Sequence, residues 1–214
     1  LKTSAPRPPS PRSLMSRPPG CSARAGVRVP RVLAEQPGGL LISDLGEGGR
    51  GALVFNERLD QAAASGPAAL GSAWREGLDA IAAVHARGCY LSQAFARNLM
   101  RCPDAVIGFI DFEDDPGEVL SLAECQARDW LSYLHSTALL VHALAPHAAA
   151  DHWHAVLAGA DAAVRERIVL AARRMRWLRH LPKGRRWGRD TQRVRAVARL
   201  LAQWHAGGER RPSA

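Results

Sequence analysis

Two stretches decide the interpretation of this chain: His85-Ala-Arg-Gly-Cys-Tyr-Leu-Ser-Gln-Ala-Phe-Ala-Arg-Asn-Leu-Met100 and Ile110-Asp-Phe-Glu-Asp-Asp115. The first predicts the end of a helix, a polar loop and the start of a hairpin, and the second predicts a strand that ends in carboxylates. Asn98 offers a neutral oxygen ligand and Asp111 a charged one. Hard cations such as Mg²⁺ take such ligands and commonly share them with phosphates. The alternative is a polar loop beside a solvated acidic turn.

The surroundings of these stretches predict a mainly α protein with a few strands. Leu70, Trp74, Leu78, Ile81 and Val84 recur at helical spacing and predict a helix with Gly88 as its cap. Further helices are predicted over 122–145, over 161–181 and from Asp190 onward, the first two ending before a proline. Upstream, alternation predicts one strand over 27–33, and an apolar run predicts another over 40–45. The pattern is therefore that of a helical domain preceded by a small hairpin.

The same residues resemble the catalytic core of the protein-kinase-like superfamily, in its lipopolysaccharide-kinase-like and small-molecule phosphotransferase branches. His85-Ala-Arg-Gly88 is similar to the helix end of that family, Asn98 to its metal-binding Asn, and Asp111-Phe-Glu113 to its metal-binding Asp motif. The resemblance assigns Asn98 and Asp111 to Mg²⁺, and Asp44, Asn98 and Asp111 to cofactor binding. Asp129 resembles the Asp that supports the catalytic loop, and His85 is expected to give structural support. ATP and Mg²⁺ are the cofactors that this resemblance implies.

Two departures from the family pattern concern catalysis. Gln93 stands five residues before Asn98, where the family has its catalytic Asp. An amide accepts no proton from a substrate hydroxyl, although it could still orient one by hydrogen bonding. Before Val27 the only lysine is Lys2, and there is no Gly-rich phosphate loop. We therefore expect a kinase-like large lobe that lacks most of the small lobe, has a degenerate catalytic loop and binds nucleotide poorly.

The net charge of +9 is unevenly distributed along the chain. Residues 1–26 carry five basic side chains and no acidic one, residues 165–214 carry fifteen and three, and residues 27–164 carry nine and seventeen. A uniformly basic binding domain is therefore excluded. The basic C-terminal run includes Trp177 and Trp187 and is interpreted in two ways. It is either a solvated face of the last helices or a grip for the phosphates of nucleic acid or anionic lipid.

Three further stretches have competing interpretations. Glu113, Asp114 and Asp115 form either a second metal or cationic contact or, preferably, a solvated turn before Pro116. In Asp151-His-Trp-His154 the two histidines stand two residues apart, on different sides of a helix, which favours surface histidines over a metal site. No apolar run reaches the roughly 20 residues of a membrane helix, and the N-terminus lacks the apolar core of a secretory signal. We expect a cytoplasmic protein, with peripheral attachment at the inner membrane as the alternative.

These observations divide the chain into four expected parts. They are a disordered Pro/Arg-rich tail (1–26), remnant small-lobe strands with the hinge (27–48), a kinase-like helical large lobe (49–206) and a disordered tail (207–214). Because the sequence starts at Leu1 rather than Met, we expect either a fragment or an unusual start.

The expected function is that of a kinase-type phosphotransferase that passes phosphate from ATP to a hydroxyl acceptor, impaired or inactive in this chain. One alternative is a pseudokinase-like binding scaffold. The other is a protein that binds anionic lipid, a lipopolysaccharide-precursor surface or, less favoured, nucleic acid through its basic C-terminal helices.

Overall fold

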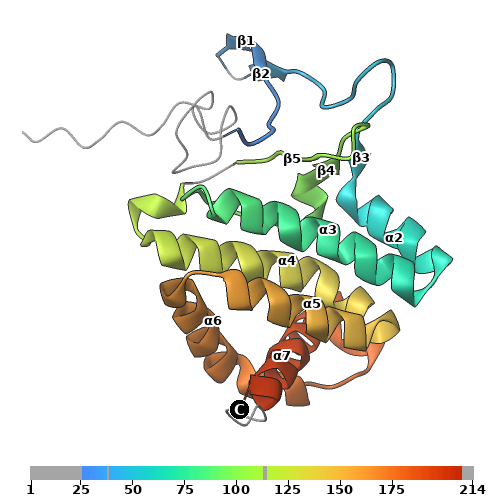
Figure 1. Cartoon of the computed structure of the whole chain (residues 1–214), viewed down its shortest axis with the longest axis vertical. Coiled ribbons are helices and arrows are strands. Elements are labelled where there is room, and N and C mark those ends of the chain that lie inside the picture. Colours follow the sequence, from blue (N-terminus) through green and yellow to red (C-terminus); the bar gives the residue numbers. More distant parts are fainter. Residues whose placement is uncertain (1–25, 38, 113–114, 209–214) are drawn as a thin grey trace, which may run out of the picture.

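The computed structural model of the chain describes residues 26–37, 39–112 and 115–208. These residues form a mainly helical α+β protein with two small antiparallel sheets, which confirms the predicted fold class. In Figure 1 the strands lie above a stack of helices, with α7 at the opposite end of the molecule. The α-helices, short 3₁₀-helices (η) and strands are β1 Val32–Gln36, β2 Gly39–Ile42, β3 Leu53–Val54, α2 Phe55–Ser65, α3 Pro67–His85, η1 Ala96–Asn98, β4 Leu99–Arg101, β5 Ile107–Phe109, η2 Pro116–Glu118, α4 Leu122–Leu144, α5 Pro146–Gly159, α6 Ala162–Met175, η3 Arg176–His180, η4 Arg185–Trp187 and α7 Arg189–Gly208.

Helices α3 and α4 form the centre of the core. The predicted stripe of α3 is buried from Leu70 to Val84. A capping box between Ser121 and Glu124 starts α4, and Pro146, which begins α5, follows its end. The predicted bounds of both helices therefore agree with the structure to within a few residues.

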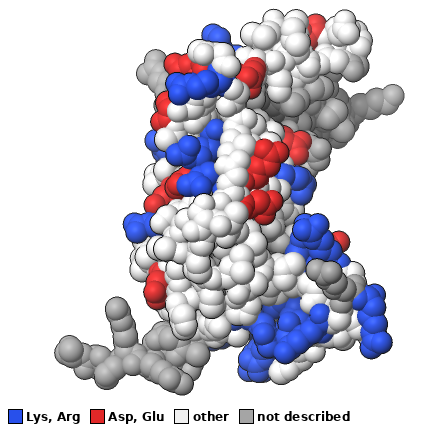
Figure 2. All heavy atoms as spheres, turned by 90° about the vertical axis from the view of Figure 1, so that its right-hand side faces the viewer, with Lys and Arg blue, Asp and Glu red and all other residues white. Residues whose placement is uncertain are grey.

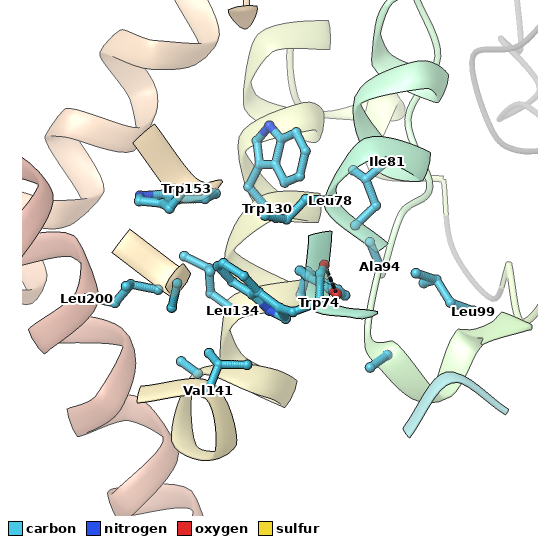
Figure 3. Packing of buried hydrophobic residues seen from close by; sticks show 14 of the residues in the cluster. Trp74, Leu78, Ile81, Ala94, Leu99, Trp130, Leu134, Val141, Trp153 and Leu200 are labelled. Atoms are coloured by element: carbon cyan, nitrogen blue, oxygen red, sulfur yellow. Dashed lines mark hydrogen bonds between the residues drawn. The ribbon is translucent and has the colours of Figure 1, made fainter. Parts of the chain in front are cut away.

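Three tryptophans from three helices join these elements. Trp74 of α3, Trp130 of α4 and Trp153 of α5 are almost completely buried, and Figure 3 shows them in one continuous cluster of apolar side chains. The ring centroids of Trp130 and Trp153 lie 5.9 Å apart, edge to face. The indole Nε1 of Trp74 donates to Thr137 Oγ1 at 2.9 Å, so this polar atom is satisfied inside the core.

The two sheets are built differently. β1 and β2 form a hairpin in which Gln36 pairs with Gly39, whereas β3, β4 and β5 form a three-stranded sheet in the order β3-β4-β5. In that second sheet Leu99 pairs with Phe109, and both side chains are buried. The segment before β1 also reaches this sheet, because Phe109 N donates to Arg28 O at 2.9 Å.

Several predicted bounds are wrong for local reasons. The first strand begins at Val32 rather than Val27, because the preceding residues run beside β5 instead of pairing with β2. The second strand stops at Ile42. The predicted Gly88 cap, by contrast, is confirmed: α3 ends at His85, Gly88 adopts a φ of +70°, Gly88 N donates to His85 O at 2.9 Å, and Cys89 N donates to Val84 O at 3.3 Å. The helix predicted over 161–181 breaks at Met175 into α6 and η3.

The predictions for the two ends of the chain are only partly covered by the structure. The predicted disordered tail over 1–26 falls outside the described residues except at Gly26. Gly207 and Gly208 belong to α7, so a tail beginning at 207 is wrong at its first two residues. The rest of that tail also falls outside the described part of the chain.

Candidate functional site

The buried carboxylate of Asp129 fixes the loop that carries the predicted catalytic residues. This loop, residues 86–98, connects α3 to β4, and Asp129 projects toward it from α4. Oδ2 of Asp129 accepts from Leu91 N at 2.7 Å and lies 3.0 Å from His85 Nε2. Complete burial raises the pKa of Asp129, while the hydrogen bond from His85 lowers it in part. The structure thus brings the two predicted supporting residues together.

The amide of Gln126 makes a second connection from α4 to the same loop. Its Nε2 donates to His85 O at 3.1 Å and to Cys89 O at 2.9 Å. These bonds satisfy carbonyls where α3 ends. Glutamine and aspartate three residues apart lie on one face of α4, so a single helix face holds the loop at two points.

Asn98 is held within the same loop by Gln93. The side-chain Nδ2 of Asn98 donates to Gln93 O at 3.1 Å, and Asn98 O accepts from Ile110 N at 2.9 Å. Asn98 is only 4% exposed, and its side-chain bond to Gln93 O sets the direction of its amide. With the amide nitrogen committed to the loop, the amide oxygen is the atom available as a ligand.

Asp111 follows β5 and faces the same space. Its φ of +69° lies in the left-handed region, which Asp adopts more readily than most residues. A cavity of about 300 Å³ is lined by Pro30, Ile42, Arg97, Asn98, Ile110 and Asp111. We call it the Asn98–Asp111 cavity. The structure therefore brings together the two residues predicted to hold Mg²⁺, although thirteen positions separate them in the sequence.

Arg97 is a residue of this cavity that sequence reasoning missed. It is exposed, and its guanidinium lies over the Phe95 ring at 4.4 Å from the centroid. An arginine beside two oxygen ligands supplies the positive charge that a phosphate group requires. The feature of the sequence that could have identified Arg97 is its position directly before Asn98. The sequence could not predict that Pro30 and Ile42 line the cavity, because they come from the segment before β1 and from β2, far from Asn98 in the sequence.

Gln93 lies at the turn of the 86–98 loop and is half-buried. The residue before it, Ser92, has a φ of +65° and is fully buried, and its Oγ has no hydrogen-bond partner among the described residues. A non-glycine residue in this region costs about 1–3 kcal/mol and is most often found at functional sites. The backbone is therefore bent directly before Gln93, whose side chain is an amide.

The remaining predicted residues lie elsewhere. Asp44 is exposed and does not line the Asn98–Asp111 cavity. Asp115 accepts from Gly117 N and from the Tyr90 hydroxyl, so it caps η2. Glu113 and Asp114 lie outside the described residues. His152 and His154 are half-buried on α5, and no group of three His, Cys, Asp or Glu side chains suited to a metal occurs in 26–37, 39–112 and 115–208.

The donor set fits Mg²⁺ that shares its coordination with a phosphate. Mg²⁺ is commonly bound by only one or two carboxylates together with water and substrate phosphates. Asp111 offers the carboxylate, Asn98 offers a neutral oxygen, and Arg97 stands beside them. A metal held by protein ligands alone would require more oxygen atoms than these two side chains provide.

No helix within the described ranges is long and apolar enough to cross a membrane.

No protein-family model matches the chain, and no curated protein or solved structure matches it. The residues of the site are therefore the basis for assigning its function.

Proposed function

We propose that this chain is a kinase-like phosphotransferase in which the metal-binding half of the active site is preserved and the catalytic base is absent. The observation that carries the proposal is the Asn98–Asp111 cavity, in which two oxygen donors and Arg97 meet. Segment 27–48 would correspond to the small-lobe remnant and 49–206 to the helical lobe. When bound, Mg²⁺ with ATP would supply charge neutralisation at the transferred phosphate.

Each residue of the site would have a separate role. Asn98 and Asp111 would hold the metal, and Arg97 would contact phosphate oxygens. Asp129 would act through the backbone, because its bond to Leu91 N fixes the loop that contains Gln93. Gln93 would hydrogen-bond the acceptor hydroxyl without taking its proton, since an amide has no basic site at neutral pH. Positioning without proton transfer predicts weak activity.

A thermal-shift titration with ATP and Mg²⁺ tests the binding step. Stabilisation by about 1 kcal/mol would raise the melting temperature by about 2–4 °C for a chain of this size. Asp111→Asn should abolish the shift. Asp60→Asn is the matched control, because it makes the same change on the exposed face of α2. If millimolar nucleotide with Mg²⁺ gives no shift, or if both variants behave alike, the proposal is wrong.

The variant Gln93→Asp separates an impaired enzyme from a binding scaffold. A carboxylate at this position would accept the hydroxyl proton, a contribution of about 10²–10⁴-fold in rate. With water as the hydroxyl acceptor, we expect the hydrolysis of ATP to ADP and phosphate in the presence of Mg²⁺ to increase by at least about a hundredfold. If the variant binds Mg²⁺ and ATP like the parent chain and ADP release does not increase, the pseudokinase-like scaffold is the better description.

A groove next to the loop supports an anionic amphiphile as the acceptor or partner. It has a volume of about 800 Å³, lies between α4, α6 and α7, and reaches Phe95 of the 86–98 loop. Its floor contains Leu131, Leu170 and Val197. Arg128, Arg167 and Arg174 supply guanidinium groups, and Glu124, which also lines the groove, pairs with Arg167 at 3.6 Å. An apolar floor beside several cations suits an acyl chain with an anionic headgroup.

Vesicle co-sedimentation tests this second proposal. The chain should sediment with vesicles that contain phosphatidylserine and not with vesicles of phosphatidylcholine alone. Arg174→Glu should weaken the association more than Arg173→Glu, since both side chains are exposed on α6 but only Arg174 lines the groove. Equal loss in the two variants would indicate general charge attraction and contradict a role for the groove.

A further inference from the structure

Part of the basic C-terminal run surrounds a second pocket, away from the Asn98–Asp111 cavity. Figure 2 shows blue Lys and Arg atoms gathered at the lower end of one face, the end at which Figure 1 places α7. Helix α7 packs against α4 and η3. Where these three elements meet, a pocket of about 550 Å³ is lined by His142, Arg179, His180, Arg199, Ala202 and Gln203. We call it the cationic pocket.

The lining of the cationic pocket is positive and contains no acidic residue. His142 comes from α4, Arg179 and His180 from η3, and Arg199 from α7. Arg195 lies one turn before Arg199 on the same face of α7. Arg179 Nε donates to His180 Nε2 at 2.9 Å, which directs one guanidinium edge toward the histidine. Within 26–37, 39–112 and 115–208, no carboxylate forms an ion pair with Arg179, Arg195 or Arg199.

Two buried polar atoms at this place have no partner in the described part of the chain. They are His142 Nδ1 and Arg195 Nε. Burial lowers the pKa of His142, and the positive charges of Arg199 and Arg195 lower it further. Burial and then Arg199 likewise lower the pKa of Arg195. Like charges thus oppose each other around a cavity, at a cost that an oppositely charged ligand would offset.

We propose that the cationic pocket binds a phosphate-type oxyanion that carries more than one negative charge. Guanidinium groups present several N–H donors in a plane and match the oxygen atoms of phosphate. Arg199 and Arg179 would donate from two elements, and His142 from a third. A ligand with several charges is required because a single carboxylate would leave most of these cations unmatched. The inference is independent of phosphate transfer at the Asn98–Asp111 cavity.

Isothermal titration with sodium pyrophosphate tests the proposal. The titration is made with the full chain, at about 0.15 M salt to screen nonspecific attraction and with a chelator so that no divalent cation bridges ligand and Asp111. We expect saturable binding with one site. Arg199→Gln should weaken it at least about tenfold, because a charge-assisted hydrogen bond is lost. Asp60→Asn, a change on the exposed face of α2 outside both cavities, should leave it unchanged.

Arg189→Gln is the matched control on the same helix. It removes one positive charge about 15 Å away along α7, at an exposed position outside the pocket. Circular dichroism of both variants verifies that each is folded. Absence of saturable binding in the parent chain overturns the proposal. Equal affinities in folded Arg199→Gln and Arg189→Gln overturn it as well.

The role of His142 is tested with sulfate, whose charge stays constant between about pH 5 and 8. The groups that face His142 are Arg195 and Arg199 from α7 and Arg179 and His180 from η3. Protonation of His142 would add one donor and one positive charge, so binding should tighten as the pH falls. His142→Gln should flatten this dependence. An unchanged pH dependence in His142→Gln would remove this residue from the site.

Discussion

The Asn98–Asp111 cavity is lined by Ile42 at the end of the β1–β2 hairpin and by Asn98 and Ile110, which directly flank the β4–β5 hairpin, but only the second hairpin is built into the core. Leu99 of β4 and Phe109 of β5 are 0% and 4% exposed, whereas Leu33 and Leu41 of the first hairpin are 58% and 59% exposed. The oxygen donors thus stand on a packed wall, and the opposite wall, with Ile42, carries few buried side chains. Local stability follows buried apolar contact, so the two walls should differ in rigidity.

This difference matters for the proposed function. If the side of the cavity with Asn98 and Asp111 is rigid, its oxygen donors are in place before a ligand binds. The β1–β2 side, by contrast, offers a nucleotide base little buried apolar surface to contact. We therefore expect Mg²⁺ and phosphate contacts to dominate any affinity for ATP. Variants on the two sides of the cavity should have very different effects on stability. The largest loss of stability should come from Asp129, which supports the 86–98 loop.

Asp129→Ala is expected to have the largest effect. The change leaves the amide of Leu91 without its acceptor and removes the carboxylate from His85, in a fully buried place. We expect a loss of about 3–5 kcal/mol in the free energy of unfolding, measured by urea denaturation. Asp129→Asn keeps one acceptor oxygen and should lose less. If Asp129→Ala costs no more than Asp129→Asn, the loop does not depend on this carboxylate.

Leu99→Ala and Leu41→Ala compare the two hairpins directly. Leu99 is completely buried, so its truncation should cost about 2–4 kcal/mol in the free energy of unfolding. Leu41 is mostly exposed, and its truncation should change the free energy by less than about 0.5 kcal/mol. Denaturation curves of the two variants measure the difference. Similar losses would mean that the first hairpin is packed in solution, against the comparison above.

Gly77→Ala probes the helices beneath the second hairpin. A Cβ at Gly77 would overlap Tyr133 Oη and lie 2.8 Å from the Phe55 ring, so α3 must move away from its neighbours. We expect a loss of about 1–3 kcal/mol from overpacking. Gly159→Ala is the control, because its Cβ would meet nothing within 4 Å. Thermal unfolding distinguishes the two, and an equal melting temperature would show that α3 adapts without strain.

The sequence predicted the central helices and the hairpin because their signals are local. The α3 stripe of Leu70, Trp74 and Leu78 follows helical spacing, and the capping residue Ser121 stands directly before α4. Helix α2 was missed, and α5 was treated as helical only around His152 and His154. Each helix buries only three residues, so its apolar stripe is short. Their helical state depends on the packing surface that α3 offers.

The candidate site was predictable only in part. Asn98 and Asp111 were selected because they are oxygen ligands beside a predicted strand and because they resemble a family motif, and in the structure both line one cavity. Asp44 was placed by its position near the predicted hinge, but its side chain is exposed because β2 ends before it. The cationic pocket was not predictable, since His142, Arg179 and Arg199 become neighbours only when α7 folds back onto α4. Charge runs in a sequence do not say which members converge.

Arg28→Gln should have the smallest effect of the series and tests how the first wall is attached. Arg28 bonds to Asp104 in the turn between β4 and β5, with oxygens at 2.6 and 2.7 Å, and both side chains are about one-third exposed. This hydrogen bond holds the pKa of Asp104 below its ordinary value. A lowered pKa stabilises the folded chain above the unfolded-state pKa, and the contribution is lost as the pH falls through the folded-state pKa. The stability difference between the parent chain and Arg28→Gln, measured by urea denaturation, should therefore be small near neutral pH and vanish in acid.

Arg75→Gln removes the same charge from an exposed pair on α3 and serves as the control. If Arg28→Gln retains its full effect in acid, the ion pair with Asp104 does not hold the segment before β1 against the second sheet. Backbone contacts such as the bond from Phe109 N to Arg28 O would then hold it.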